Sequence, residues 1–198
     1  KISGNKIVVL LRRLGTSVDW SISRFTMDEG LSLSVKKVFI ELFNKGLIYQ
    51  DKRLVNWDTV LETAVSDLEV NQKEIEGKLW FIKYKIYEDD EFITVATTRP
   101  ETMFGDAAIA VHPQNEKLNK YIGKKANIPF SKKLIPIIAD KYADPKKGSG
   151  AVKITPAHDF NDFLIGKKHN LDFINIFNKN AKLNENVPKK FFGLDRYK

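Results

Sequence analysis

The stretch KLWFIKYKIYEDDEFITVATT, residues 78–98, decides the fold. Within 78–87 the residues alternate, and in a strand every second side chain points to the same face. One face carries Trp80, Ile82, Tyr84 and Ile86. The acidic residues 88–91 interrupt this pattern, and a second strand-like run follows at 92–98. Two such runs joined by a short polar turn predict a β-hairpin.

Beyond the hairpin, the chain continues as short apolar segments and short helical patterns. Four further strands are predicted at 107–111, 134–138, 151–155 and 173–177. Two short helices are predicted at 114–121 and 161–169. Short strands with helices between them are typical of an α+β domain around a bent or barrel-like sheet. The sequence therefore predicts an α+β fold whose main part is a β-barrel-like domain at residues 51–198.

The N-terminal part has helical rather than strand periodicity. Apolar residues recur at helical spacing within 25–47 and predict one helix there. Gly46 supplies its C-terminal cap. Its start is open between a capping box that begins at Thr26 and a cap at Ser32. We therefore expect a helical segment at residues 1–50, ahead of the β-rich domain.

Composition limits the chemistry that the chain can carry. Hydrophobic residues make up 42% and charged residues 29%, a balance that indicates a folded protein. The sequence has no cysteine, which excludes disulfides, a thiol nucleophile and a cysteine-ligated zinc site. No apolar run approaches the ~18 residues of a membrane span, and residues 1–6 lack the apolar core of a signal peptide. We expect a soluble, cytoplasmic protein with no membrane partner.

The net charge is positive, because 33 Lys and Arg stand against 25 Asp and Glu, which gives +8. An excess of this size favours a polyanionic partner such as RNA. A lysine-rich surface with no role in nucleic-acid binding is the alternative, and charge alone does not separate the two.

The stretch TTRPETMFGD, residues 97–106, begins where the second hairpin strand ends. Pro100 stops the strand because it has no backbone N–H, and it keeps Arg99 out of helical geometry. A guanidinium and several threonine hydroxyls are therefore gathered in a turn at a strand end, where binding residues often collect. Ordinary turn chemistry explains the same residues without a site.

The stretch GSGAVKITPAHDFNDF, residues 148–163, has a similar organisation, since a strand stops at Pro156 and a helix follows. Asp159 is placed to cap this helix. Asp162 falls in the first turn, where the helix dipole favours a carboxylate. Capping alone explains both acids, and a single histidine such as His158 is more often structural than catalytic.

Together the two stretches carry a specific resemblance. TTRPETMFGDAAIAVHP at 97–113 and GSGAVKITPAHDFNDF at 148–163 resemble the paired signatures of the editing domain in the valyl-tRNA synthetase family. LRRLGTSVDWSISRFTMDEG at 11–30 and LVNWDTVLETAVSDLEV at 54–70 also match the valyl pattern. Leucyl editing domains are similar, but Glu101 and the residues that follow it favour the valyl type.

The resemblance implies a hydrolytic fragment of a larger ligase, as the chain ends at Lys1 and Lys198 also suggest. The editing domain is then expected at 51–198, and 1–50 is expected to link it to the synthetic domain. The HIGH-like and KMSKS-like motifs of a complete class I synthetase do not occur, so we expect no ATP-dependent ligation by this chain. Residues 58–61 lack the CxxC of some valyl enzymes, and neither a metal nor a cofactor is expected.

The implied reaction removes threonine from mischarged tRNA(Val), by direct attack of water on the aminoacyl ester. Three residues are expected to take part in catalysis. By resemblance, Asp162 anchors the α-ammonium of the substrate through a charge-assisted hydrogen bond. Asp159 and Lys153 are expected to recognise the threonine hydroxyl or to orient the water. The expected partners are the acceptor end of tRNA(Val) carrying threonine and the rest of the synthetase chain.

Five further residues are expected to bind the substrate: Arg99, Thr98, Thr102, Thr155 and His158. Arg99 and Thr102 would position the terminal nucleotide and the ester, whereas a structural role in its turn is the favoured interpretation for His158. The alternatives are an acceptor-end binding module without independent catalysis, a leucyl-type editing domain, and a basic RNA-binding domain with no catalytic role.

Overall fold

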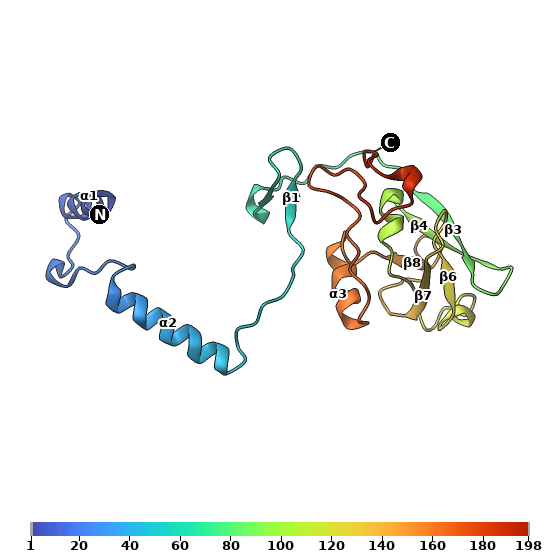
Figure 1. Cartoon of the computed structure of the whole chain (residues 1–198), viewed down its shortest axis with the longest axis horizontal. Coiled ribbons are helices and arrows are strands. Elements are labelled where there is room, and N and C mark those ends of the chain that lie inside the picture. Colours follow the sequence, from blue (N-terminus) through green and yellow to red (C-terminus); the bar gives the residue numbers. More distant parts are fainter. Residues whose placement is uncertain (1, 198) are drawn as a thin grey trace. The chain divides into compact units, whose positions relative to one another are not determined.

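The computed structural model describes residues 2–197, which divide into two compact units between Lys52 and Arg53 (Figure 1). The first unit is helical and the second contains all the strands that the described residues form. None of the described helices is long and apolar enough to cross a membrane.

The first unit contains α1 (Ile2–Arg13), a 3₁₀ turn at Trp20–Ile22 and α2 (Glu29–Asn44). Helix α2 begins after Asp28, whose carboxylate accepts a hydrogen bond from the backbone N–H of Leu31 at 2.8 Å. The two predicted starts, Thr26 and Ser32, are therefore wrong, because Asp28 supplies the N-terminal cap itself. The C-terminal end matches the prediction, since Gly46 follows α2 with a φ of +70°.

The second unit is built on a six-stranded sheet with the order β4-β3-β6-β7-β5-β8. Only β5 and β7 pair in parallel, and the other pairs are antiparallel. Strands β4 and β8, at the two ends of this order, also approach each other, so the sheet is nearly closed. The strands are β3 (Trp80–Ile86), β4 (Phe92–Thr97), β5 (Ala108–Val111), β6 (Lys125–Asn127), β7 (Leu134–Ala139) and β8 (Ala151–Ile154). The predicted α+β, barrel-like fold is confirmed.

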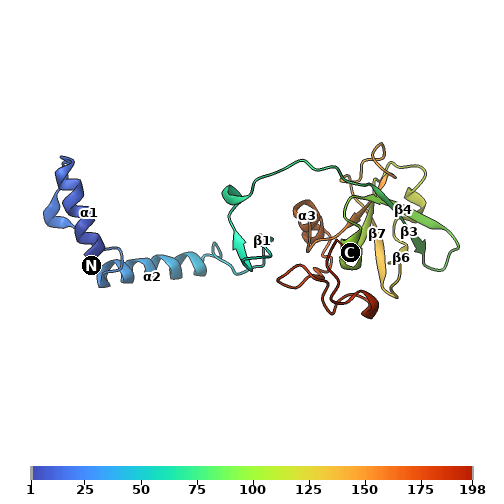
Figure 2. The ribbon, with the colours of Figure 1, turned by 90° about the horizontal axis from the view of Figure 1, so that it is seen from above.

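A two-stranded hairpin, β1 (Asn56–Asp58) with β2 (Thr63–Val65), precedes this sheet. Helix α3 (Phe160–Lys168) follows β8 and lies beside the barrel (Figures 1 and 2). Short 3₁₀ helices occupy Asp67–Glu69, Pro100–Gly105, Asn119–Tyr121 and Lys189–Phe191. The predictions did not include α1, β1, β2 or β6.

Two predicted elements are wrong. No strand forms at 173–177, where the only pairing among the described residues is a single bridge between Phe177 and Leu183. Residues 114–121 form turns that end in the 3₁₀ helix rather than a helix along their whole length. The side chains of His112 and Asn115 accept hydrogen bonds from nearby backbone N–H groups there, and such bonds compete with helix formation.

The hairpin prediction is confirmed, because β3 and β4 pair from Trp80 opposite Thr97 to Lys85 opposite Phe92. The predicted apolar face is only partly buried: Tyr84 and Ile86 lie in the core, whereas Trp80 is half exposed. The core fills the barrel with aliphatic residues from every strand of the sheet, including Ile93, Ile109, Ala126, Ile135 and Ala151. This packing fixes the strand ends from which the candidate site is built.

Candidate active site

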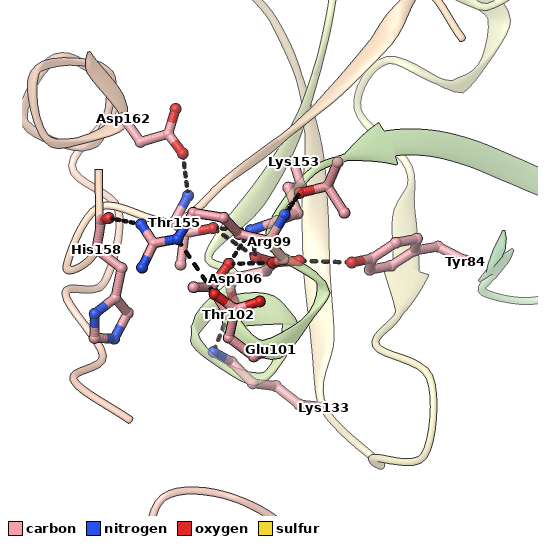
Figure 3. Close-up of polar contacts among 11 residues, drawn as sticks. Tyr84, Arg99, Glu101, Thr102, Asp106, Lys133, Lys153, Thr155, His158 and Asp162 are labelled. Atoms are coloured by element: carbon pink, nitrogen blue, oxygen red, sulfur yellow. Dashed lines mark hydrogen bonds and ion pairs between the residues drawn. The ribbon is translucent and has the colours of Figure 1, made fainter. Parts of the chain in front are cut away.

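Two turns from distant parts of the sequence meet at one end of the barrel (Figure 3). The first turn, Pro100–Gly105, follows β4, and the second, 155–159, follows β8. The antiparallel pairing of β5 with β8 joins them, and it continues in a hydrogen bond from Ala107 N to Ile154 O at 2.9 Å. Both predicted motif stretches therefore contribute to one site.

Gly105 permits this close approach. A Cβ atom at Gly105 would lie 3.0 Å from the carbonyl oxygen of Ile174, 3.2 Å from Cδ2 of His158 and 3.3 Å from Cγ2 of Thr155. These distances are shorter than ordinary carbon contacts, and one of the three neighbours is backbone. The absence of a side chain is therefore what lets the two turns pack together.

The centre of the site is the carboxylate of Asp106, which is completely buried. The hydroxyl of Tyr84 donates to its Oδ2 at 2.6 Å, and the hydroxyl of Thr155 donates to its Oδ1 at 2.7 Å. The ammonium of Lys153 lies 2.9 Å from the same Oδ1 and forms an ion pair with it. A buried charge is tolerated when it is paired and hydrogen-bonded in this way.

Lys153 is also buried, with 8% of its surface exposed. Its Nζ donates to Thr102 Oγ1 at 2.7 Å, to Asp106 Oδ1 and to Thr155 Oγ1. An ammonium has three N–H donors, so all of them are used within the protein. A substrate hydroxyl can bind Lys153 only in exchange for one of these bonds.

Asp162 reaches the site from the first turn of α3 and is 6% exposed. Its Oδ2 accepts a hydrogen bond from the backbone N–H of Thr155 at 2.8 Å. Burial raises the pKa of Asp162 to about 6, and the charges of Asp159 and Asp106 act in the same direction, whereas the Thr155 N–H and Lys153 oppose them. The carboxylate is therefore desolvated and well suited to a cationic partner.

Asp159 is exposed and caps α3, since its Oδ1 accepts from the backbone N–H groups of Asn161 at 2.8 Å and Asp162 at 3.1 Å. This is the capping role that the sequence also allowed. Because Asp159 supplies the cap, the Asp162 side chain is not needed for that role and points towards Thr155 (Figure 3).

Arg99 joins the two turns from the exposed side. Its guanidinium donates to the carbonyl oxygen of His158 at 2.7 Å and to Glu101 at 3.3 Å. The hydroxyl of Thr102 donates to the carbonyl oxygen of Arg99 at 2.9 Å, which fixes the start of this turn. Thr98 is exposed beside Arg99, just after the end of β4.

His158 is held as a neutral ring. Its Nε2 accepts a hydrogen bond from the backbone N–H of Ile176 at 3.1 Å, and its ring packs edge-on against Phe177, with centroids 4.9 Å apart. Burial lowers the pKa of His158 to about 4, and the charges of Arg99 and Lys153 lower it further. These contacts support the structural role that the sequence favoured.

The structure thus brings together residues of both motifs. The buried ones are Thr102, Lys153, Thr155 and Asp162, and those at the surface are Thr98, Arg99 and Asp159. Four residues whose side chains bond to this network were not among the predicted site residues: Tyr84, Glu101, Asp106 and Lys133. Lys133 donates to the carbonyl oxygen of Asp106 at 3.0 Å. Asp106 stood inside a quoted motif, whereas the distant Tyr84 and Lys133 left no signal beyond their residue type.

No group of three or more acidic or histidine side chains within residues 2–197 could hold a metal ion.

Comparison with known proteins identifies the family. The family model for tRNA synthetases class I (I, L, M and V) matches residues 3–177. The chain belongs to the class I tRNA synthetases. This family membership covers both structural units, since the match extends from α1 to the segment after α3.

Within this class, the chain is similar to valine–tRNA ligases. It is 57% identical to the valine–tRNA ligase of Pelagibacter ubique (strain HTCC1062), over 98% of the chain and 22% of that ligase. Identity to the Legionella pneumophila (strain Lens) ligase is 56%, over 98% of the chain and 21% of the ligase. Identity to the Caulobacter vibrioides ligase is 51%, over 98% and 24%. The resemblance to valyl enzymes is confirmed, and the chain spans about a fifth of the length of these relatives.

A solved ternary complex of LeuRS with tRNA and LeuAMS from Agrobacterium radiobacter K84 matches the chain with a TM-score of 0.45 and 19% sequence identity. The match covers 84% of this chain and 30% of that chain.

Proposed function

We propose that this chain is the editing segment of a valine–tRNA ligase and that it hydrolyses the ester of mischarged Thr-tRNA(Val). The observation that carries the proposal is Asp162, a buried carboxylate that accepts a hydrogen bond from the backbone N–H of Thr155 and whose pKa is raised to about 6. A desolvated carboxylate at the edge of a polar network is suited to bind the α-ammonium of an aminoacyl group. The similarity to valine–tRNA ligases supports tRNA(Val) as the tRNA of the proposed substrate.

A second site is needed because threonine and valine have nearly the same shape. A valine pocket rejects threonine by only roughly 10²-fold, a value known for this class of enzyme and not obtained from the present structure. A site that hydrogen-bonds the threonine hydroxyl rejects valine more strongly, because valine would leave the polar groups of the site unpaired. Lys153 and Thr155 are the buried polar groups suited to this contact, with one existing bond of Lys153 exchanged for the substrate hydroxyl.

The surface residues are assigned to the tRNA end of the substrate. Arg99 and Thr98 would contact the terminal nucleotide, and Thr102 would support the ester side of the pocket. Asp159 has an exposed carboxylate beside Asp162 and would orient the attacking water. His158 would hold the second turn in place as a neutral ring.

Direct attack by water suits this arrangement better than covalent catalysis. The chain has no cysteine. Nε2 of His158 is occupied by the Ile176 N–H, so this nitrogen is not available to activate a hydroxyl nucleophile. Aminoacyl esters are labile, so the positioning of the ester and the water, together with the local charges, supplies the acceleration of hydrolysis. We assign no metal, no cofactor and no ATP-dependent step to this segment.

The proposed partners are the acceptor end of tRNA(Val) and the remainder of the ligase, acting in the cytoplasm. The net charge of +8 favours the phosphate contacts that such a partner offers. The residues 1–52 unit would connect the hydrolytic unit to the synthetic part of the ligase.

Deacylation assays with three substrates test the proposal: Thr-tRNA(Val), Val-tRNA(Val) and Ile-tRNA(Leu). We expect the purified chain, and the complete ligase that contains it, to hydrolyse Thr-tRNA(Val) and to spare the other two. Hydrolysis of Ile-tRNA(Leu) would show a leucyl-type editing site instead. Binding of tRNA(Val) without hydrolysis by either protein would show a binding module.

A further inference from the structure

The most deeply buried charge in the site belongs to Asp106, a residue that the proposed reaction does not use directly. Its side chain is 0% exposed, so it cannot touch a substrate in this structure. It is nevertheless the acceptor that Tyr84, Lys153 and Thr155 share (Figure 3). Its effect on a substrate must therefore be transmitted through these neighbours.

Proton positions in this network follow from donor and acceptor counts. Lys153 has only donors, so both threonine hydroxyls must accept from it. Thr155 then gives its own proton to Asp106 Oδ1 at 2.7 Å, and Thr102 gives its proton to the Arg99 carbonyl at 2.9 Å. Each hydroxyl keeps only a free lone pair for a further partner. The hydrogen-bond directions of these groups are thus fixed, and Asp106 is the acceptor that fixes those of Lys153 and Thr155.

We infer that Asp106, supported by Tyr84, is the positioning residue that sets the hydrogen-bond directions of Lys153 and Thr155, and so the preference for a hydroxyl-bearing aminoacyl group. This inference rests on the proposed function and deepens it. Without the carboxylate, the Lys153 ammonium loses its only buried ion-pair partner within the described residues, and Thr155 loses the acceptor that orients its proton. If the Lys153 ammonium and the Thr155 hydroxyl can reorient, the site distinguishes threonine from valine less well.

Asp106→Asn is the conservative test. Asparagine has nearly the shape of aspartate, but it is uncharged and has one acceptor oxygen where the carboxylate has two, so Tyr84, Lys153 and Thr155 no longer share a charged acceptor that fixes their hydrogen-bond directions. Tyr84→Phe removes only the bond to Oδ2 and leaves the ion pair. Asp106→Asn therefore disturbs the contacts of the residue 106 side chain more than Tyr84→Phe does.

Tyr121→Phe is the matched control. Tyr121 is also a buried tyrosine on this unit, and its hydroxyl also donates to a carboxylate, that of Glu91, outside the candidate site. If Tyr84 had only a structural role, both tyrosine variants would change thermal unfolding alone. A positioning role predicts that Tyr84→Phe also changes substrate preference.

The experiment measures kcat/KM for deacylation of Thr-tRNA(Val) and of Val-tRNA(Val) by the complete ligase that contains this segment. We expect the preference for the threonyl substrate to fall roughly tenfold or more in Asp106→Asn and about threefold to tenfold in Tyr84→Phe. Tyr121→Phe should leave the preference unchanged. If Asp106→Asn does not fold, the comparison of the two tyrosine variants decides.

Two failures can be told apart. An unmodified ligase that shows no preference for Thr-tRNA(Val) would overturn the proposed function. An unmodified ligase that shows the preference, with the same preference retained in folded Asp106→Asn and in Tyr84→Phe, would overturn the role of Asp106 alone.

Discussion

The carboxylate of Asp162 accepts a hydrogen bond from the backbone N–H of Thr155, with 2.8 Å between Oδ2 and N. This bond ties the first turn of α3 to the end of β8 and turns the carboxylate into the site. Asp159, three residues earlier, caps the same helix. The two acids therefore make different contacts, since Asp159 accepts the N-terminal N–H groups of α3 and Asp162 accepts from Thr155 at the end of β8.

The stability of the unit should carry a pH signature of Asp162. Its folded pKa, about 6, lies above the unfolded value of 3.8, so the folded state binds more protons between these values. This contribution is fully present below about pH 3.8 and is lost as the pH rises through 6, by roughly 3 kcal/mol in all. Asp162→Asn should therefore gain stability relative to the unmodified chain as the pH rises from 4 to 7, as measured by urea unfolding. A stability difference that does not change with pH would contradict the burial of an ionisable Asp162.

His158 should titrate far below the usual histidine range. Its folded pKa of about 4 lies below the unfolded value of 6.5, so the neutral ring contributes stability above pH 6.5 that is lost as the pH falls towards 4. NMR of the ring protons, assigned with a His158→Gln variant, should show a midpoint near pH 4. A midpoint near 6.5 would mean that the ring is solvated and that Nε2 does not accept the Ile176 N–H.

Gly105→Ala should lower both stability and deacylation, because the added methyl group would lie 3.0 Å from the Ile174 carbonyl oxygen. Forcing an atom into a packed contact typically costs about 1–3 kcal/mol. Gly77→Ala is the matched control, since a Cβ atom at Gly77 meets nothing within 4 Å. Thermal unfolding and deacylation of Thr-tRNA(Val) would be measured on both variants. Equal unfolding temperatures for the two would show that the turns do not need the close approach.

The sequence predicted those parts of the fold that depend on neighbouring residues. The alternation in 78–87 and the polar turn after it are local signals, and the hairpin formed as expected. The segment 173–177 has the same apolar character but does not form a strand. Its Ile176 N–H donates a hydrogen bond to the His158 ring rather than to a neighbouring strand. Tertiary contacts of this kind cannot be detected in a single sequence.

Residues of the candidate site could be proposed from the sequence where they lie in one short stretch, but not where they meet only across the barrel. Arg99, Thr102 and Asp162 were proposed from two short stretches. Tyr84 and Asp106 are 22 residues apart, one in β3 and the other just before β5, and they come together across the nearly closed sheet. The direction of the Asp162 side chain was also beyond the sequence, because its usual role in a first helical turn explained it equally well.

The proposed binding of the substrate ammonium depends most on the negative charge of Asp162, and single-turnover deacylation of Thr-tRNA(Val) by Asp162→Asn, in the complete ligase at neutral pH, tests it most directly. The amide oxygen of asparagine can still accept from Thr155 N–H, so the variant removes the charge and keeps the local bond. Loss of a desolvated charged contact typically costs ~2–5 kcal/mol.

The matched control is Asp58→Asn, which changes another carboxylate that accepts backbone N–H groups, from Val60 and Leu61, in the β1–β2 turn. We predict that Asp162→Asn slows deacylation at least roughly thirtyfold, while valine activation and the Asp58→Asn control stay at the unmodified rate. Deacylation by a folded Asp162→Asn variant at the unmodified rate would contradict the proposal that this carboxylate anchors the substrate.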